Sequence, residues 1–358
     1  MTADVLDRRT LNRALLARQH LLERAPLTPI EAVEHLVGMQ AQAPNPPYVG
    51  LWSRLADFSF ADLGTLVETR AAVRILLMRG TIHLVSARDA AALRPLTQAV
   101  LDRYVRGFGD VLADAVAHAR DLCAEAPRSA KELRTLLGAR WPEHDAAELA
   151  RAVHYSLPLV QVPPRGVWGK GGAARHTTLD AWLGPVASDV AGLDALVLRY
   201  LAAFGPATVR DAQKWSGLTG LGEVVERLAP RLRTFRDEHG RTLYDLPDAP
   251  RPEPDTPAPV RLVPEFDNLT LSHEDRTRVI DEESRKRIFT VNGIIRATLL
   301  VDGFVHGMWT MESARGTARV RVTPFAPLPD EAAVAAEADR LLAAAHPAAT
   351  ARDVVIEY

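Results

Sequence analysis

The sequence predicts an α+β fold in which three tandem winged-helix motifs precede a C-terminal, β-rich, barrel-like domain. Helical patterns alternate with short strand patterns in the first two thirds of the chain, and a unit of three helices plus a hairpin recurs there. Beyond a proline-rich linker at residues 247–259, strand patterns dominate. We assign winged-helix unit 1, with a glutamine motif, to residues 1–110, unit 2 to 111–190, unit 3 to 191–250 and the β-rich domain to 260–358.

Unit 1 is the least regular copy and runs from Thr10 to two predicted strands at 73–78 and 81–85. Unit 2 is more regular, and Ser129 is a typical N-cap for its second helix. A segment rich in glycine and cations then follows a strand, as in a wing. The predicted elements of unit 2 are helices at 113–123, 130–137 and 143–154, a strand at 159–162 and a wing at 163–172.

Unit 3 is the clearest copy. Apolar residues at helical spacing end at Gly205, Thr208 is a typical N-cap for the next helix, and Gly217 ends that helix. Three helices and a hairpin, with a tight turn between the second and third helices, are typical of a winged helix. The predicted elements are helices at 193–204, 209–215 and 219–228, the last capped by Thr219, and strands at 232–235 and 242–246 joined by a turn at 237–240.

The last hundred residues alternate short apolar runs with turn residues. Asp302-Gly303 between two of these runs is a strong hairpin signal. An amphipathic pattern over 329–345 predicts one helix. The predicted strands lie at 260–263, 289–291, 297–301, 305–311, 318–322 and 353–358. A generic α-rich domain with short hairpins is the alternative to the winged-helix series.

The composition excludes several classes of protein. No apolar run approaches the roughly 20 residues that span a bilayer, and the first residues lack the apolar core of a signal peptide, so we expect a cytoplasmic protein. Cys123 is the only cysteine, so no disulfide, zinc knuckle or iron–sulfur cluster forms within the chain. We expect no metal and no cofactor. The net charge is −2, whereas many nucleic-acid binders have a clear excess of basic residues. Arginine greatly outnumbers lysine, but a GC-rich genome produces the same excess, so it is weak evidence for phosphate binding.

The segment Gln40-Ala41-Gln42 is the strongest candidate for an active site. A predicted helix from about Pro29 runs to this point, and Pro44, Pro46 and Pro47 prevent its continuation. Residues two apart point to the same side only where the chain is extended or irregular. We therefore expect Gln40 and Gln42 to emerge together, so that their amides hold one water. The alternative is that both glutamines face solvent or cap a helix.

The chain resembles the winged-helix DNA glycosylases of the AlkZ and YcaQ type. Gln40-Ala41-Gln42 matches the family's Gln–hydrophobic–Gln signature, and Gln42 places the chain on the AlkZ-like branch, because YcaQ-type members carry Asp there. The resemblance implies three tandem winged helices, a C-terminal β-domain and action on bulky guanine adducts or interstrand crosslinks made by antibiotic natural products. The other matching segments are 48–54, 79–85, 204–208 with Asp211, 215–217, 262–268 and 302–309.

The glutamine pair restricts the chemistry. Glutamine does not titrate near neutral pH and cannot act as a general base, so the substrate must already be activated. Guanine alkylated at N7 carries a positive charge and leaves as a neutral base. We therefore predict a DNA glycosylase that acts on double-stranded DNA with alkylated purines. We expect it to be monofunctional, because no lysine near the motif offers a Schiff base. No membrane and no obligate protein partner are expected.

Two other classes of function stay open. A non-catalytic winged-helix transcriptional regulator would explain the repeats, but it would leave Gln40 and Gln42 without a role. A resistance protein that sequesters a small molecule is the third hypothesis.

Further residues are candidates for DNA contact or for orienting the motif. Arg79 and His83 lie on the first predicted wing, although a structural role for His83 is an equal alternative. Asn45 and Tyr48 follow the motif closely, and Arg54 either reaches phosphate or pairs with Asp57. Asp267 and Asn268 favour a turn over a metal site. On the second predicted wing the candidates are Arg165, Trp168 and Lys170, and Trp168 has packing under the hairpin as its alternative.

Overall fold

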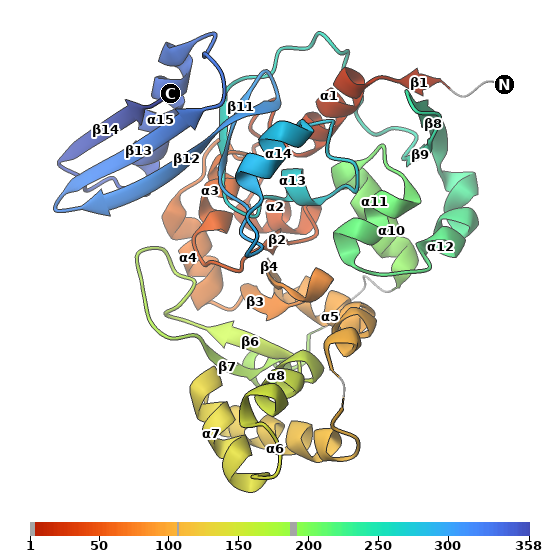
Figure 1. Ribbon diagram of the computed structural model, residues 1–358, viewed down its shortest axis with the longest axis vertical. Helices are drawn as coiled ribbons and strands as arrows, with labels where there is room; N and C mark the ends of the chain where they lie inside the picture. Colours follow the sequence, from red (N-terminus) through yellow and green to blue (C-terminus); the bar gives the residue numbers. More distant parts are fainter. Residues whose placement is uncertain (1–3, 106, 187–191) are drawn as a thin grey trace.

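The computed structural model describes residues 4–105, 107–186 and 192–358, and its strands form three sheets. The largest sheet has six strands in the order β2-β4-β3-β6-β7-β5 and is shared by units 1 and 2, because β3 pairs with β6 (Figure 1). The boundary that we place at 190–191 lies outside the described residues. The strands are β2 (Met39–Gln40), β3 (Ala72–Leu76), β4 (Ile82–Ser86), β5 (Arg128–Ser129), β6 (Leu159–Val162) and β7 (Arg175–Thr178).

Unit 1 surrounds the glutamine segment with helices. α2 (Pro29–His35) begins at a capping box formed by Thr28 and Glu31. It ends before the glutamine motif, earlier than expected, because Val37 and Gly38 take positive φ angles of 53° and 90°. The prolines begin the next helix instead of ending this one. The other helices are α1 (Arg8–Arg18), α3 (Pro46–Trp52), α4 (Phe60–Glu68), α5 (Ala87–Leu101), η1 (Met78–Gly80) and η2 (Asp102–Tyr104).

Unit 2 contains the three expected helices and the expected strand β6, and it has a small core of its own. Strand β7, which pairs with β6 after the predicted wing, was not expected. Ser129 forms a capping box with Glu132, which confirms the predicted cap. Cys123 lies in this core, and burial raises the pKa of its thiol to about 11. The helices are α6 (Val111–Glu125), α7 (Ala130–Arg140), α8 (Ala146–Ser156) and α9 (Leu179–Leu183).

Unit 3 follows the sequence pattern closely. Thr208 caps α11 together with Asp211, and Gly217 ends that helix with a φ of 78°, as predicted. Thr219 does not cap the third helix: the N-cap is Gly220, whose φ of 74° is in the left-handed region. The elements are α10 (Leu193–Phe204), α11 (Val209–Ser216), α12 (Leu221–Leu228), η3 (Ala229–Arg231), β8 (Arg233–Asp237) and β9 (Thr242–Asp245), with β1 (Val5–Leu6) parallel to β8.

The C-terminal sheet is open, so the expected barrel-like closure is wrong. Its order is β10-β11-β12-β13-β14, with β10 and β14 at the two edges. β14 joins β13 in parallel through the crossover helix α15, and this connection adds a strand at the edge without returning the chain to β10. The elements are β10 (Arg261–Val263), α13 (Asn268–Leu271), α14 (Glu282–Ile288), β11 (Thr298–Val301), β12 (Phe304–Ala314), β13 (Thr317–Pro324), α15 (Glu331–Ala345) and β14 (Ala351–Ile356).

Two local predictions for this part had different outcomes. Asp302 and Gly303 have φ angles of 47° and 81° between β11 and β12, so the hairpin predicted there is confirmed. The strand predicted at 289–291 is not present as a strand. The chain instead turns back on itself there, with a single bridge between Phe289 and Ile295.

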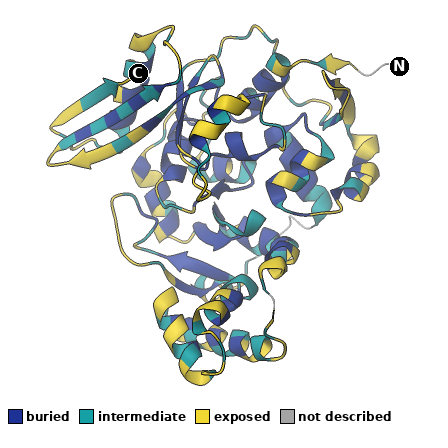
Figure 2. Cartoon of the chain, in the orientation of Figure 1, coloured by how far each residue is buried: buried dark blue, intermediate teal, exposed yellow. Residues whose placement is uncertain are grey.

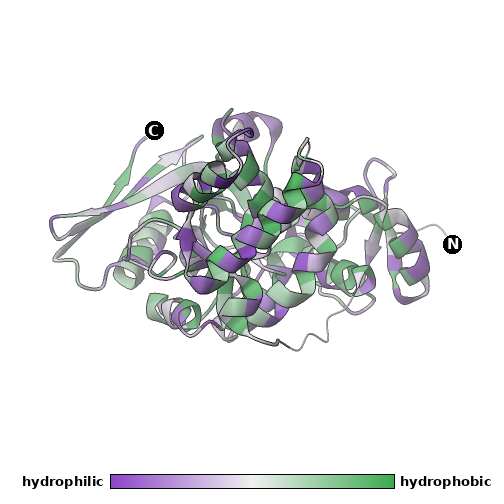
Figure 3. Cartoon of the chain, turned by 90° about the horizontal axis from the view of Figure 1, so that it is seen from below, coloured by the Kyte–Doolittle hydropathy of each residue, from purple (hydrophilic) through white to green (hydrophobic). Residues whose placement is uncertain are grey.

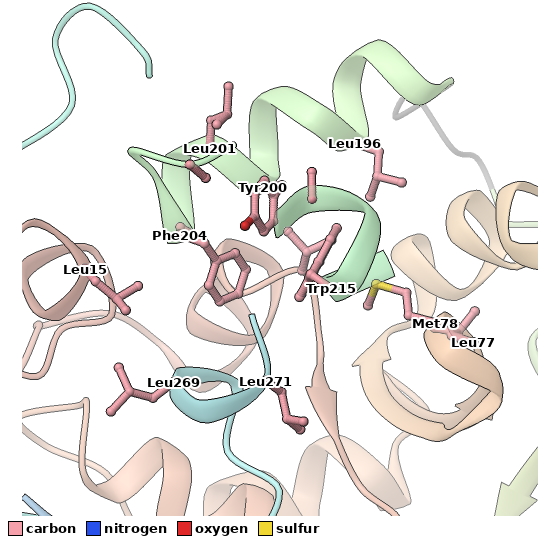
Figure 4. Packing of buried hydrophobic residues seen from close by; sticks show 14 of the residues in the cluster. Leu15, Leu77, Met78, Leu196, Tyr200, Leu201, Phe204, Trp215, Leu269 and Leu271 are labelled. Carbon is pink, nitrogen blue, oxygen red and sulfur yellow. The ribbon is translucent and has the colours of Figure 1, made fainter. Parts of the chain in front are cut away.

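The main core connects unit 3 to the segment that carries Arg79. Tyr200, Phe204 and Trp215 pack their rings together at centroid distances of 4.9–5.6 Å, and Leu77 and Met78 lie in the same cluster (Figure 4). Figure 2 shows that buried residues follow the six-stranded sheet and the inner helices. This packing fixes the backbone of unit 3 against the loop between β3 and β4.

The described ranges contain helices whose length and hydropathy decide whether they can cross a membrane. No helix within them is long and apolar enough to cross a bilayer. The outer helices carry hydrophilic and hydrophobic residues on different sides (Figure 3). Within the same ranges, no three His, Cys, Asp or Glu side chains gather as metal ligands would.

Candidate active site

Gln40 ends strand β2 and is held by the neighbouring strand. It pairs in register with His83 of β4, and only 8% of its surface is exposed. Its Oε1 accepts a hydrogen bond of 2.9 Å from Arg79 Nη2. Because a guanidinium only donates, this bond identifies the atom that faces Arg79 as the oxygen, and the Gln40 amide nitrogen points elsewhere.

Gln42 lies two residues further on and is exposed. Its Oε1 accepts from the backbone N–H of Ile82 at 3.2 Å. Both glutamine oxygens therefore contact the segment 79–83, but only Gln42 presents its side chain to solvent. A carbonyl oxygen has two lone pairs, so the Gln42 amide keeps one acceptor position and both amide hydrogens for a water or substrate.

Arg79 is the centre of the interactions around Gln40. Its φ of 57° is in the left-handed region, where a residue with a side chain is strained. Besides Gln40, its guanidinium contacts His83 Nε2 at 3.3 Å and the carbonyl of Trp215 in unit 3. Burial lowers the pKa of Arg79 to about 10, with a smaller effect from Arg276, so the group stays charged at neutral pH. Arg79 thus connects the motif to unit 3, and a DNA contact by Arg79 stays a prediction.

His83 supports this arrangement from inside the protein. Its Nδ1 lies 3.0 Å from the Thr81 carbonyl, which only accepts, so Nδ1 carries the proton and Nε2 accepts from Arg79. Burial, and then the charge of Arg79, lowers the pKa of His83 to about 3. His83 is therefore a neutral, buried histidine, in keeping with the structural role that was the alternative to a DNA contact.

Tyr48 and Trp168 connect α3 to the second wing. The Tyr48 hydroxyl donates to the Gly166 carbonyl at 2.7 Å and accepts from the Trp168 backbone at 3.1 Å. Burial raises the pKa of Tyr48 to about 12. The Trp168 indole donates to the Ala345 carbonyl, and its ring packs edge-on against Phe60 at 4.5 Å. These contacts favour the packing role of Trp168 over a DNA contact, and its entry into a DNA groove stays untested.

Arg54 neither reaches toward phosphate nor pairs with Asp57, the two partners expected from the sequence. It is fully buried and forms a bidentate ion pair with Asp267 at 2.7 and 2.9 Å, so its partner is neither phosphate nor Asp57. Asp267 also caps α13, in keeping with the predicted turn. The physical reason is that a guanidinium inside a core requires a buried carboxylate, and Asp267 comes close only through tertiary folding.

The remaining candidates lie at the surface or near it. Asn45 is exposed and stands at the N-cap position of α3 without a capping hydrogen bond. Lys170 is exposed and pairs with Glu68 at 2.6 Å. Arg165 donates to the Gly172 carbonyl within its own wing. A DNA contact by these three residues stays a prediction.

Two residues that hold the motif in place were not found from the sequence. Arg74 Nη2 donates to the carbonyl of Ala41, between the two glutamines, at 2.6 Å. Asn268 donates from its amide to the Gly38 carbonyl at 2.9 Å. The signal for Arg74 is a charged residue inside the apolar run 72–78, where a buried arginine must have a specific partner.

A cleft of about 580 Å³ opens beside Gln42. We call it the α7–α8 cleft, because residues of these helices form one wall and residues of β3, β6 and β7 form the other. Gln161 and His176 line it on the sheet side, and Lys131 and Arg151 line it on the helix side. Gln42 thus lines the α7–α8 cleft, and Gln40 does not line it.

Comparisons with known proteins identify the family from the sequence and a matching fold from a solved structure. A family model described as "DNA glycosylase AlkZ-like" matches residues 33–344. The solved structure of the Streptomyces sahachiroi DNA glycosylase AlkZ superposes with a TM-score of 0.79 over 100% of both chains at 20% sequence identity. At that identity the likeness shows the fold alone. No curated protein sequence matches the chain.

Proposed function

We propose that this chain, which belongs to the AlkZ-like DNA glycosylase family, is a monofunctional enzyme that releases cationic N7-alkylguanine from double-stranded DNA. The family makes it a hydrolase of N-glycosidic bonds in DNA. The preference for a cationic base rests on one observation: the partners of the glutamine side chains are a cation and a backbone amide, and neither can remove a proton.

The reaction that this site suits needs little acid or base help. The bond from C1′ to N9 breaks, its electron pair goes to the alkylated base, and the base leaves neutral. The sugar becomes an oxocarbenium ion, and a water adds to C1′ and releases a proton to solvent. The Gln42 amide offers the free acceptor that orients such a water, and Arg79 fixes the orientation of Gln40 behind it.

Lysine chemistry is a weaker alternative. Lys131 lines the same cleft as Gln42, a proximity that the sequence does not indicate. However, Lys131 is exposed, and an amine that forms Schiff bases is usually activated by apolar surroundings or a neighbouring cation inside a pocket. We therefore expect no covalent adduct to be trapped by borohydride during turnover.

A protruding hairpin is suited to contact the DNA. Residues 290–294 form a tight turn whose tip carries Val291, fully exposed, and Ile294, which is 46% exposed. Its base is near the site, since Arg276 lies over the Phe289 ring and its charge acts on Arg79. Apolar side chains at such a tip are used by other proteins to separate base steps in the minor groove. We propose the same role for Val291.

The experiment that tests the proposed function measures the bases released from alkylated duplex DNA. The wild-type protein should release N7-methylguanine, or a bulkier N7 adduct or crosslink if methyl is too small, and should leave uracil in place. Gln42→Ala should lose this release. Gln98→Ala is the matched control, since this glutamine of α5 donates a hydrogen bond to Asp102, away from the motif.

The other outcomes would refute the proposal. Binding to DNA without release of any base would favour the regulator. Neither binding nor release, with protection against an alkylating drug retained, would favour sequestration. Excision of uracil would exclude the restriction to cationic bases.

A further inference from the structure

A row of polar side chains crosses the six-stranded sheet beneath the α7–α8 cleft. Arg74 of β3 pairs in register with Gln161 of β6, and Gln161 pairs with His176 of β7. Paired residues of antiparallel strands share a face, so these three side chains lie on the same side of the sheet. All three are buried, with 2–8% of their surface exposed, and Gln161 and His176 line the cleft.

Several polar atoms of this row have no hydrogen-bond partner within the described part of the chain. The clearest are Gln161 Oε1 and the Nε and Nη1 of Arg74, and the ring of His176 has only a weak interaction with the backbone of Arg128 on the paired strand. Buried polar groups in native proteins are almost always bonded, because an unpaired one has lost its water without compensation. Gln161 and His176 both line the cleft, so their incompletely bonded polar groups indicate that a ligand completes them.

The histidines of the cleft are neutral groups. Burial lowers the pKa of His176 to about 4, and it lowers the pKa of His154, which packs edge-on against His176 at 4.9 Å, to about 3. Each neutral imidazole offers one donor and one acceptor. The site is therefore equipped for a ligand with both kinds of group and without a charge requirement.

The rest of the lining is apolar on its walls and cationic at its exposed edge. Leu76, Leu133 and Ala150 give apolar surface, and Lys131 and Arg134 are exposed. None of the described residues that line the cleft is acidic, so a cationic ligand gains nothing there. The volume of about 580 Å³ is in the range of roughly 300–1,000 Å³ typical of pockets for drug-sized molecules.

We propose that the α7–α8 cleft receives the substituent attached to guanine N7, a mostly apolar group with hydrogen-bond donors and acceptors, which Gln161 and His176 recognise. The inference rests on the proposed function, because it needs the damaged nucleotide at Gln42, which borders the cleft. The exposed cations then face the phosphates that flank the lesion. The cleft thereby makes the enzyme selective for the size and polarity of the adduct.

The experiment compares three N7 adducts on the same duplex: methyl, benzyl and 4-carbamoylbenzyl. DNA is alkylated with each reagent, and released N7 products are quantified by mass spectrometry as initial rates. We expect the wild type to release the carbamoylbenzyl adduct at least about tenfold faster than the methyl adduct, as one or two added hydrogen bonds allow. Gln161→Leu and His176→Phe should each lower this ratio towards that of the unsubstituted benzyl adduct.

The ratio is measured within one variant, so a loss of folded protein cancels. His118→Phe is the matched control, because this histidine of unit 2 packs on Trp141 and does not line the cleft, and it should keep the wild-type ratio. An equal ratio in wild type, Gln161→Leu and His176→Phe would overturn the inference while release of N7-methylguanine leaves the proposed function standing. Absence of release from all three substrates would overturn both.

A final arm separates a DNA-attached group from a free molecule. 4-Methylbenzamide, the probe without DNA, is titrated into the protein and followed by saturation-transfer NMR. We expect at most weak contact, since the free molecule lacks the anchoring duplex. Tight binding of the free probe, together with no preference among the three adducts, would overturn the inference in favour of sequestration.

Discussion

Replacement of Arg79 by methionine tests whether this cation orients Gln40 or binds DNA. The change keeps apolar volume but removes the donors to Gln40 Oε1 at 2.9 Å, His83 Nε2 at 3.3 Å and the Trp215 carbonyl. A hydrogen bond to a charged group contributes about 1.5–3 kcal/mol. If the bond to Gln40 is needed in the transition state, its loss slows base release roughly 10–150-fold.

The assay for Arg79→Met is single-turnover release of the best N7-alkylguanine substrate, together with the salt dependence of DNA binding. We expect a lower rate constant and an unchanged salt slope, because the guanidinium already donates to Gln40 and to the Trp215 carbonyl. Arg165→Met is the matched control, since it removes a guanidinium from the second wing. A salt slope that falls by about one unit in Arg79→Met, with an unchanged rate, would refute the assignment and make Arg79 a phosphate contact.

Three further predictions concern stability. Arg54→Ala should lower the free energy of unfolding by about 3–5 kcal/mol, because it leaves Asp267 buried without its partner, and a loss below 1 kcal/mol in urea denaturation would contradict this. Trp168→Ala should cost about 3–5 kcal/mol through lost packing on Phe60 but leave the salt slope of DNA binding unchanged, whereas weaker DNA binding at full stability would make Trp168 a DNA contact. Acidification should destabilise the fold below about pH 6.5, because His83 and His176, with pKa values lowered to about 3 and about 4, protonate more readily when unfolded. Each contributes at most about 1.4 kcal/mol per pH unit, and a melting temperature that is constant from pH 7 to pH 4.5 would contradict this prediction.

Local signals in the sequence predicted the elements well. Ser129 and Thr208 cap their helices as expected, and Asp302-Gly303 forms the hairpin. These features depend on hydrogen bonds and φ angles within a few residues, so the neighbouring residues in the sequence are enough to predict them. Thr219 failed as a cap because the left-handed Gly220 took that position. The count of three winged helices stays a prediction.

Long-range pairings could not be predicted in the same way. Units 1 and 2 share one sheet through β3 and β6, and the C-terminal strands form an open sheet instead of closing into a barrel. An individual strand can have the same alternation of apolar and polar residues in either sheet, so its partner is decided by the packing of helices far away in sequence. The parallel β14 depends on the crossover through α15 in this manner.

The glutamine pair illustrates the division between the two kinds of information. The sequence by itself determined that Gln40 and Gln42 form a candidate site and that a neutral site requires a base ready to leave, because these conclusions depend on side-chain chemistry alone. Only the tertiary structure decided that Gln40 is buried against Arg79, that Gln42 borders a cleft, and that Arg74 holds the Ala41 carbonyl. The physical reason is that the partners of the motif come from other strands, which meet it only when the sheet assembles.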